Sequence, residues 1–182
     1  MEGDTMRALV VYESLFGNTR EVAGAIADGP RGRLSVETVD VVEAPTALAV
    51  TWDLVVVGGP THAFGLTRPS TRESAQQQGA PAGASLRRRG LREWLADVSG
   101  PKGLPVAVFD TRIARPRLPG SAARAAARRL RALEFRLQEP PESFWVEGTG
   151  GPLVEGELER ARAWGALLVA DVSGLASASS PA

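Results

Sequence analysis

Apolar residues along this chain gather in short, uninterrupted runs. Runs of this length without polar alternation predict strands that are covered on both faces. Another segment alternates between apolar and polar residues, which is typical of an outer strand, and a last apolar stretch is split by Pro140 and Pro141. The predicted buried strands span 6–12, 53–57 (ended by Gly58–Pro60) and 104–109, the outer strand spans 34–40, and the interrupted fifth strand spans 135–138 and 144–146.

Between these strands, apolar positions recur at the three- and four-residue spacing of a helix. Gly29 and Pro30 end the first such segment, and Ser121 is a candidate N-cap for a helix rich in alanine and arginine. Residues 61–85 are the most irregular part of the chain, and we expect 76–85 to be flexible. Helices are predicted over 20–28, 91–98, 122–133 and 155–170, with a short helix or loop over 43–50.

This alternation of strands and helices predicts a parallel sheet with helices on both faces. In such sheets, ligands bind beyond the carboxyl ends of the strands, close to the point where the strand order reverses. The loops that follow the three buried strands therefore form the candidate site, and they span 13–19, 60–68 and 110–119.

Composition narrows the possible chemistry. The 182 residues include no Cys and one His, which excludes a disulfide scaffold, a catalytic thiol and a site built from several histidines. The length favours one domain, expected over 1–172, followed by a disordered tail rich in Ser and Ala over 173–182. No apolar run reaches the roughly 18 residues of a membrane span, and no signal peptide is recognisable, so we expect a cytoplasmic protein.

Charge is balanced over the whole chain but uneven along it. Residues 111–136 hold eight Arg and a single acid, Glu134. We expect the arginines of the helix predicted in this range to form a solvated face, and they are Arg124, Arg128, Arg129 and Arg131. No aromatic residues interleave with them and the net charge is zero, so a nucleic-acid partner is not expected.

The first loop carries the clearest chemical signal. Ser14–Thr19 joins a buried strand to the start of a helix, where backbone N–H groups lack intrahelical partners and the helix dipole favours an anion. Gly17 permits a close backbone approach, and Ser14, Asn18 and Thr19 add side-chain donors, so the loop is a candidate phosphate site. An ordinary capped helix with a glycine turn is the alternative. The chain has neither the GxxxxGK motif of a nucleotide triphosphatase, nor GxGxxG after the first strand, nor GxSxG.

This loop resembles the phosphate loop of flavodoxins, in which Ser or Thr, any residue, and Ser, Thr or Phe precede Gly-Asn-Thr. The segments Asp53–His62 and Val106–Asp110 resemble, more loosely, the flavodoxin strands that lead into the two loops around the flavin ring. The resemblance extends over residues 6–170. It implies an α/β flavodoxin-like three-layer sandwich, with a five-stranded parallel sheet in the order 2-1-3-4-5 and helices on both faces, and FMN bound without a covalent link.

The resemblance also implies a role in FMN binding for each loop. It implies no catalytic residue and no metal-binding residue. The phosphate of FMN would be held by Ser14, Leu15, Phe16, Gly17, Asn18 and Thr19. One side of the flavin ring would be lined by Pro60, Thr61, His62, Ala63, Phe64 and Gly65. The other side would be lined by Asp110, Thr111, Arg112 and Ile113.

Electron transfer is the implied function, with a redox partner protein or a small-molecule electron acceptor and no membrane span. The ring loops contain neither Trp nor Tyr, so Phe64 and His62 are the aromatic candidates there. Arg112 near the ring would favour reduced, anionic flavin, whereas a surface Arg112 paired with an acid would not. An electron carrier is favoured over a stand-alone oxidoreductase. The alternatives are a small FMN-dependent quinone-type reductase, and a domain that has lost FMN and serves as a binding or regulatory module.

Overall fold

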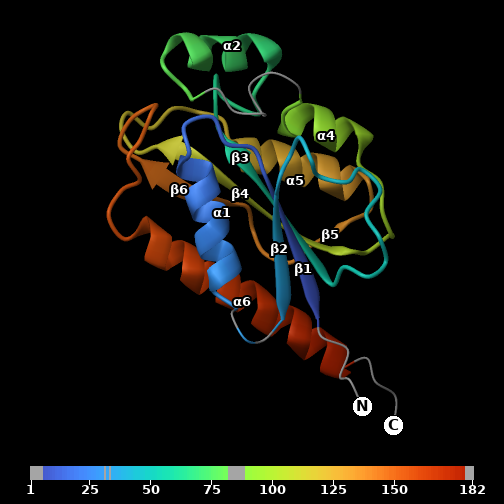
Figure 1. Ribbon diagram of the computed structural model, residues 1–182. Coiled ribbons are helices and arrows are strands. Elements are labelled where there is room, and N and C mark those ends of the chain that lie inside the picture. The colour runs from blue at the N-terminus through green and yellow to red at the C-terminus, as the bar shows by residue number, and fades with distance from the viewer. Residues whose placement is uncertain (1–5, 31, 33, 82–88, 179–182) are drawn as a thin grey trace.

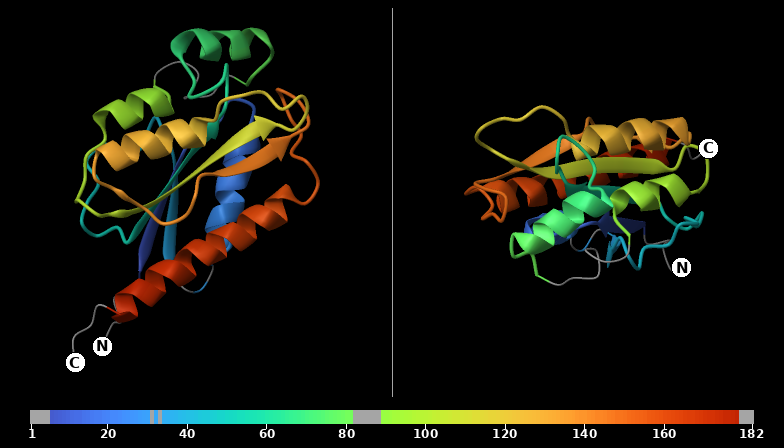
Figure 2. Two further views of the ribbon diagram at one scale, coloured as in Figure 1. Left: turned by 180° about the vertical axis from the view of Figure 1, so that it is seen from behind. Right: turned by 90° about the horizontal axis from the view of Figure 1, so that it is seen from above.

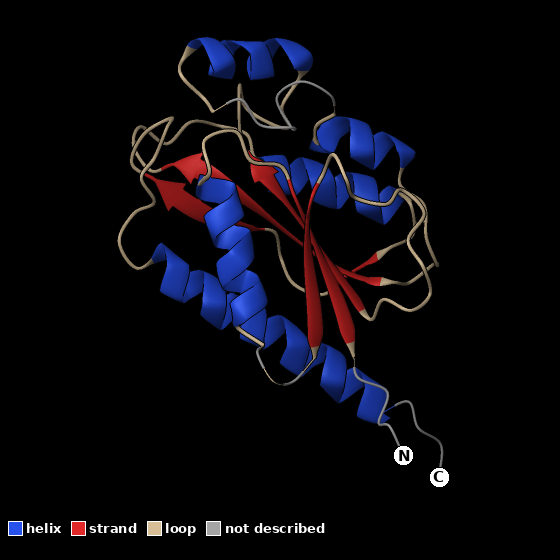
Figure 3. Cartoon of the chain, viewed as in Figure 1, coloured by secondary structure: helices blue, strands red, loops and turns tan. Residues whose placement is uncertain are grey.

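A parallel sheet lies between two layers of helices (Figures 1 and 3). The computed structural model describes residues 6–30, 32, 34–81 and 89–178. The order β2-β1-β3-β4-β5 is the predicted one, and a sixth strand, β6, also pairs with β4. The strands are β1 (Arg7–Tyr12), β2 (Ser35–Asp40), β3 (Leu54–Pro60), β4 (Pro105–Ile113), β5 (Arg136–Leu137) and β6 (Glu142–Val146).

The edge of the sheet beside β4 is made from two pieces of chain, as the two apolar segments around Pro140 and Pro141 predict. β5 pairs with the start of β4, and β6 pairs with its end, where Phe109 lies opposite Glu142 and Ile113 opposite Val146. Pairing with β6 explains why β4 continues to Ile113, beyond the end predicted from its apolar run.

Two apolar clusters fill the space between the sheet and the helices. One face is covered by α1 and α6, whose Val22 and Leu168 pack with Val10 of β1, and the other by α4 and α5 (Figures 1 and 2). Gly165 lets α6 approach α1, because a Cβ at this position would lie 2.1 Å from the carbonyl oxygen of Ile26. The helices are α1 (Asn18–Asp28), α2 (Pro69–Gln77), α4 (Leu91–Asp97), α5 (Ala122–Ala132) and α6 (Glu157–Ala178).

β3 does not end before Gly58, which corrects the strand end expected at Gly58–Pro60. The strand continues through Pro60 and remains paired with β4. A Cβ at Gly58 would lie 2.1 Å from the ring of Phe109, so this glycine makes room for a large core side chain in the sheet. The glycine therefore serves packing here and not a turn.

Helix α2 is the main element that the polar pattern does not reveal. Its residues fall in the segment read as irregular, and only Arg72 and Ala75 are buried. Pro69 occupies the first turn, and the hydroxyl of Thr71 accepts a hydrogen bond from the backbone N–H of Arg68 at 2.8 Å. The part of the expected flexible segment beyond residue 81 lies outside the described residues.

Helix α6 is longer than expected. It was predicted to end near residue 170, and it continues to Ala178, so the start of the tail expected from residue 173 is helical. Residues 179–182 lie outside the described part of the chain. Among the helices that the structure describes, none combines the length and apolar character needed to cross a membrane.

Candidate functional site

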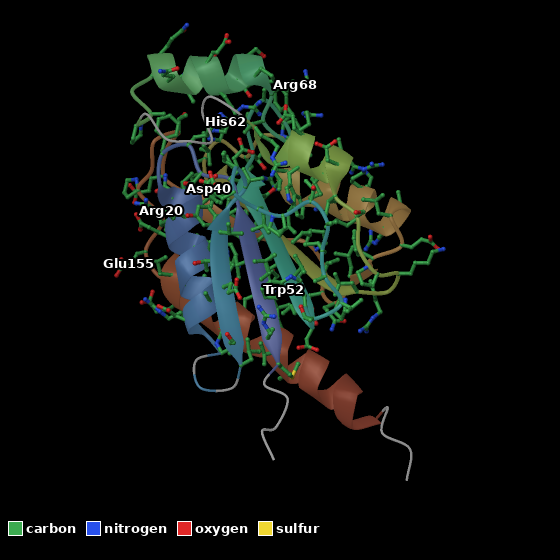
Figure 4. The ribbon with its side chains drawn as sticks, turned by 45° about the vertical axis from the view of Figure 1, so that its right-hand side comes forward. Arg20, Asp40, Trp52, His62, Arg68 and Glu155 are labelled. Carbon is green, nitrogen blue, oxygen red and sulfur yellow. The ribbon has the colours of Figure 1, made fainter. Side chains whose placement is uncertain are left out.

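A cavity of about 280 Å³ opens at the carboxyl end of the sheet, where the three predicted loops meet. His62 lies at this end of the molecule, the end capped by α2 (Figures 1 and 4). Most of the predicted site residues line the cavity: Leu15, Phe16, Asn18, Thr19, Pro60, Thr61, His62, Ala63, Phe64, Thr111, Arg112 and Ile113. The predicted residues outside its lining are Ser14, Gly17, Gly65 and Asp110.

The Ser14–Thr19 loop is the predicted phosphate loop, and its backbone turns at Gly17. Gly17 has φ +99° and precedes α1, a left-handed conformation that favours glycine. Ser14 Oγ accepts hydrogen bonds from the backbone N–H groups of Gly17 at 3.1 Å and Arg20 at 3.3 Å, so its oxygen holds the loop together. Other amides of the loop have no hydrogen-bond acceptor among the described residues, and they belong to Leu15, Phe16, Asn18 and Thr19.

Thr19 joins the first loop to the third. Its side chain is buried, and its hydroxyl shares a hydrogen bond of 2.8 Å with the hydroxyl of Thr111. The sequence suggested that this hydroxyl would be free to donate to a ligand. Either hydroxyl can be the donor of this bond, and the pairing with β4 makes Thr19 a link that fixes the start of α1 relative to the end of β4.

The second loop is a tight hairpin with a strained turn. His62 and Gly65 exchange backbone hydrogen bonds of 3.0 and 3.1 Å, and the two residues between them have positive φ, +44° at Ala63 and +72° at Phe64. These are the dihedral signs of a type I′ turn, which normally selects Gly, Asn or Asp. A Cβ at Gly120 would lie 2.0 Å from the carbonyl oxygen of Phe64, so the neighbouring loop supports the turn from below. The result is that Phe64 stands 60% exposed at the cavity.

His62 and Phe16 form an aromatic wall that joins two loops. Their rings are nearly parallel, with an interplanar angle of 11° and centroids 6.4 Å apart. Burial lowers the pKa of His62 below 6.5, because the surrounding protein disfavours the charged imidazolium. Near neutral pH this wall is therefore uncharged.

Asp110 is buried behind the cavity and does not face it. Its Oδ2 accepts hydrogen bonds from the Thr61 hydroxyl at 2.8 Å, the Ser121 hydroxyl at 2.6 Å and the Ala123 N–H at 3.0 Å. Its Oδ1 accepts one from the Ser143 hydroxyl at 2.7 Å. The carboxylate therefore joins the second loop, the start of α5 and β6, and it acts on the cavity through Thr61.

Arg112 lines the cavity, but its guanidinium is engaged elsewhere. It donates a hydrogen bond of 2.8 Å to the carbonyl oxygen of Leu118 and lies 5.4 Å from the ring centroid of Trp145. The pairing with an acid that the sequence left open is not found among the described residues. Among the described residues of the lining, Arg112 is the only charged one and none is a carboxylate.

Glu13, directly before the Ser14–Thr19 loop, joins the segment around Thr67 to the start of α4 at Leu91. Its carboxylate is fully buried and accepts hydrogen bonds from the Thr67 hydroxyl at 2.5 Å and the Leu91 N–H at 2.8 Å. Burial raises the pKa of Glu13, against the opposing effect of these donors and of Arg72. In addition, Leu15 packs with α2 and the residues after it, so α2 covers the phosphate loop.

Five residues of the lining were missed from the sequence: Gln78, Leu118, Pro119, Val146 and Thr149. Leu118 and Pro119 lie in the third loop that the sequence had already singled out. Val146 and Thr149 follow β6, whose carboxyl end reaches the same edge of the sheet. The run Gly148-Thr149-Gly150-Gly151 after an apolar strand was the available signal for this fourth loop. No group of residues suited to a metal ion occurs in the described part of the chain.

Comparison with known proteins identifies the fold. No protein-family model matches this chain, and no curated protein matches it. Solved structures of flavodoxins and flavodoxin-like proteins match it over most of its length, and the chain therefore has a flavodoxin-like fold.

Three of these structures illustrate the likeness. A flavodoxin from the domain Archaea is 16% identical, with a TM-score of 0.61 over 92% of this chain and 99% of that one. Oxidised flavodoxin 1 from Bacillus cereus is 17% identical, with a TM-score of 0.64 over 90% and 97%. A WrbA-like flavodoxin protein from Agrobacterium tumefaciens is 16% identical, with a TM-score of 0.53 over 93% and 99%.

Proposed function

We propose that this chain binds FMN without a covalent link at the carboxyl ends of its strands and acts as an electron-transfer protein. The observation that carries this proposal is the set of backbone amides at the start of α1 that have no acceptor among the described residues. Their residues line a cavity that has an aromatic wall and, among its described lining residues, no carboxylate. Amides at a helix N-terminus suit a phosphate, and an uncharged wall suits a flat, apolar ring. The residues present therefore fit the group.

Each loop has a part in this proposal. Ser14–Thr19 would hold the phosphate, mainly through backbone N–H groups. Pro60–Gly65 and Thr111–Ile113 would line the two sides of the ring, with Asp110 as a positioning residue behind them. Bound flavin would supply the capacity to accept and release electrons, while the protein binds it and tunes its potential.

Exposed residues at the cavity mouth bear on the partner. Phe64 is 60% exposed and Leu118 49% exposed, so apolar side chains stand where an electron donor or acceptor would approach. A redox partner protein or a small-molecule acceptor fits this description. A cytoplasmic location remains the expectation drawn from the sequence.

Cofactor titration tests the proposal. Purified protein is titrated with FMN, and binding is followed by quenching of flavin fluorescence and by the change in the visible flavin absorption. We expect saturable binding with one site per chain. Asn18→Ala should weaken it by about 1.5–3 kcal/mol, the value of a hydrogen bond to a charged group, because the Asn18 side chain borders the phosphate loop. A lack of saturable FMN binding by the intact protein would overturn the proposal and favour a binding or regulatory module.

A small FMN-dependent quinone-type reductase is the second candidate. The cavity lining favours it, because Phe64, Leu118 and Pro119 form an apolar side of the cavity. The described lining residues include neither of the aromatic residues, Trp and Tyr, that cover the flavin ring in many electron-carrying flavodoxins. A flat quinone suits such a surface. Steady turnover of a reduced nicotinamide with a quinone, dependent on added FMN, would favour the reductase over the carrier.

A further inference from the structure

The chain after β6 forms a second hairpin that reaches the phosphate loop. Val146 and Leu153 form an antiparallel bridge, and the Glu147 N–H donates to the Pro152 carbonyl at 2.9 Å. At the tip, the Gly151 N–H donates to the carbonyl of Gly148 at 3.0 Å, which closes a four-residue turn over residues 148–151. This tip lies at the same end of the molecule as the loop between β1 and α1 (Figure 1).

The base of this hairpin is firmly held. The carboxylate of Glu157 accepts a hydrogen bond of 2.7 Å from the backbone N–H of Trp145 and one of 2.6 Å from the guanidinium of Arg160. Arg160 also pairs with Glu142 and lies 4.4 Å from the ring centroid of Phe144. The tip therefore projects from a rigid base and has a fixed position relative to the sheet.

Close contacts join the tip to the phosphate loop. A Cβ at Gly151 would lie 2.4 Å from Oδ1 of Asn18, so the backbone of the tip lies directly against this side chain. Gly151 also has φ +95°, which favours glycine. A Cβ at Gly150 would lie 3.8 Å from Cδ1 of Phe16, and Thr149 lines the cavity together with both of these loop residues.

Thr149 is the one residue of the 148–151 turn with a polar side chain. It is exposed, and no hydrogen bond of its hydroxyl to another described residue is present. The neighbouring acid, Glu147, is exposed and does not line the cavity. The hydroxyl thus belongs to a cavity that is also lined by the residues with unpaired amides, and no described residue of that lining is a carboxylate, an environment that suits donation to an anion.

We propose that residues 148–151 form a fourth wall of the phosphate site, in which the Thr149 hydroxyl donates to the phosphate of the bound flavin and Gly151 holds Asn18 in its binding position. Thr149 is then a binding residue and Gly151 a positioning residue. This inference rests on the proposed function, because it assigns two further residues to the same cofactor site.

The test compares two ligands that differ only in the phosphate, FMN and riboflavin. Thr149→Val keeps the shape of the side chain and removes the donor. We expect it to weaken FMN binding about 10-fold or more, the effect of about 1.5 kcal/mol or more for one hydrogen bond to an anion, and to leave riboflavin binding unchanged. Thr149→Ser keeps the hydroxyl and should restore FMN affinity. Thr38→Val, at an exposed threonine of β2, is the matched control and should change neither affinity.

Gly151 is tested with a double-mutant cycle. Gly151→Ala should weaken FMN binding, and combining it with Asn18→Ala should add little, because both changes remove the same contact. Gly156→Ala is the control, since Gly156 also has positive φ but a Cβ there would meet no atom within 4 Å. Fully additive losses in the cycle would overturn the positioning role of Gly151.

The phosphate resonance of bound FMN in ³¹P spectra gives a second readout. It should move in Thr149→Val and stay in place in Thr38→Val. An unchanged FMN affinity and an unchanged resonance in Thr149→Val would overturn the inference, as would an equal loss for FMN and riboflavin, which would assign the hydroxyl to another part of the ligand. Failure of the unaltered protein to bind FMN at all would instead overturn the proposed function, so the two failures are distinguishable.

Discussion

Two substitutions of Asp110, to Ala and to Asn, should destabilise the protein by different amounts. This carboxylate is fully buried and accepts four hydrogen bonds, one of them from the N–H of Ala123 in the first turn of α5. In Asp110→Ala, the hydroxyls of Thr61, Ser121 and Ser143 can rotate toward other acceptors. The backbone N–H of Ala123 cannot. One buried donor is left without an acceptor and the favourable charge at the helix start is lost. We expect a loss of about 3–5 kcal/mol in the free energy of unfolding.

Asp110→Asn should cost less. The amide oxygen can take the place of Oδ2 and keep its three donors, while the Ser143 hydroxyl turns to accept from the amide N–H. The bonds then become neutral, and neutral bonds are about half as strong as charge-assisted ones, so we expect a loss of about 1–2 kcal/mol.

Urea unfolding followed by circular dichroism measures both losses, provided that the slope against urea stays the same. Asp97→Asn, at an exposed acid at the end of α4, is the control and should stay within about 0.5 kcal/mol of the unaltered protein. A loss below about 1 kcal/mol in Asp110→Ala would refute the assignment of this carboxylate as the joint between the loops. Equal losses in the two variants would refute the argument from the unpaired N–H.

Four other outcomes follow from the surroundings of individual residues. Burial raises the pKa of Glu13 above 4.5. We therefore expect the difference in free energy of unfolding between the unaltered protein and Glu13→Gln to favour the unaltered protein most below about pH 4.5. This difference should fall as the pH rises through the folded-state pKa of Glu13. Burial also acts to raise the pKa of Glu93, but hydrogen bonds outweigh this effect, and the pKa is lowered. The same comparison with Glu93→Gln should therefore show the opposite pH dependence, with the advantage of the unaltered protein lost as the pH falls below about 4.5. His62 is the single histidine, so its imidazole signals in NMR spectra are unambiguous, and their titration midpoint should lie below 6.5, whereas a midpoint at or above 6.5 would contradict its burial. Gly120→Ala should lower the melting temperature more than Gly103→Ala does, since both sites have positive φ but only a Cβ at Gly120 would meet backbone atoms.

The sheet was predictable because each buried strand is marked by residues that are adjacent in the sequence. Strands covered on both faces must be apolar at nearly every position, and this requirement shows directly in the runs that became β1, β3 and β4. The loop over Ser14–Thr19 was equally visible as a strand, a glycine turn and a helix start that follow one another within a few residues. Even the broken edge strand was visible, because Pro140 and Pro141 cannot continue the ladder.

Contacts between distant polar residues were not predictable in the same way. Helix α2 has little apolar periodicity, and it is held by Arg72, which is buried and pairs with Glu93 at 3.1 Å. Asp110 follows an apolar strand like a ligand-binding residue, and its partners on three other segments become apparent only in the folded chain. Thr149 was missed for the same reason, because it lines the cavity together with Phe16 and Asn18, which are far away in the sequence.

Features that cost stability are concentrated at the cavity end of the sheet. A buried carboxylate at Glu13, a second at Asp110 and a left-handed turn at Ala63 and Phe64 each oppose folding unless the surrounding structure compensates them. Glu134 also has positive φ, but it follows α5, where a left-handed residue ordinarily ends a helix. Unfavourable features that serve no packing need are expected where a chain positions groups for a ligand. Their concentration around one cavity therefore supports a functional role for this end of the molecule independently of the likeness to flavodoxins.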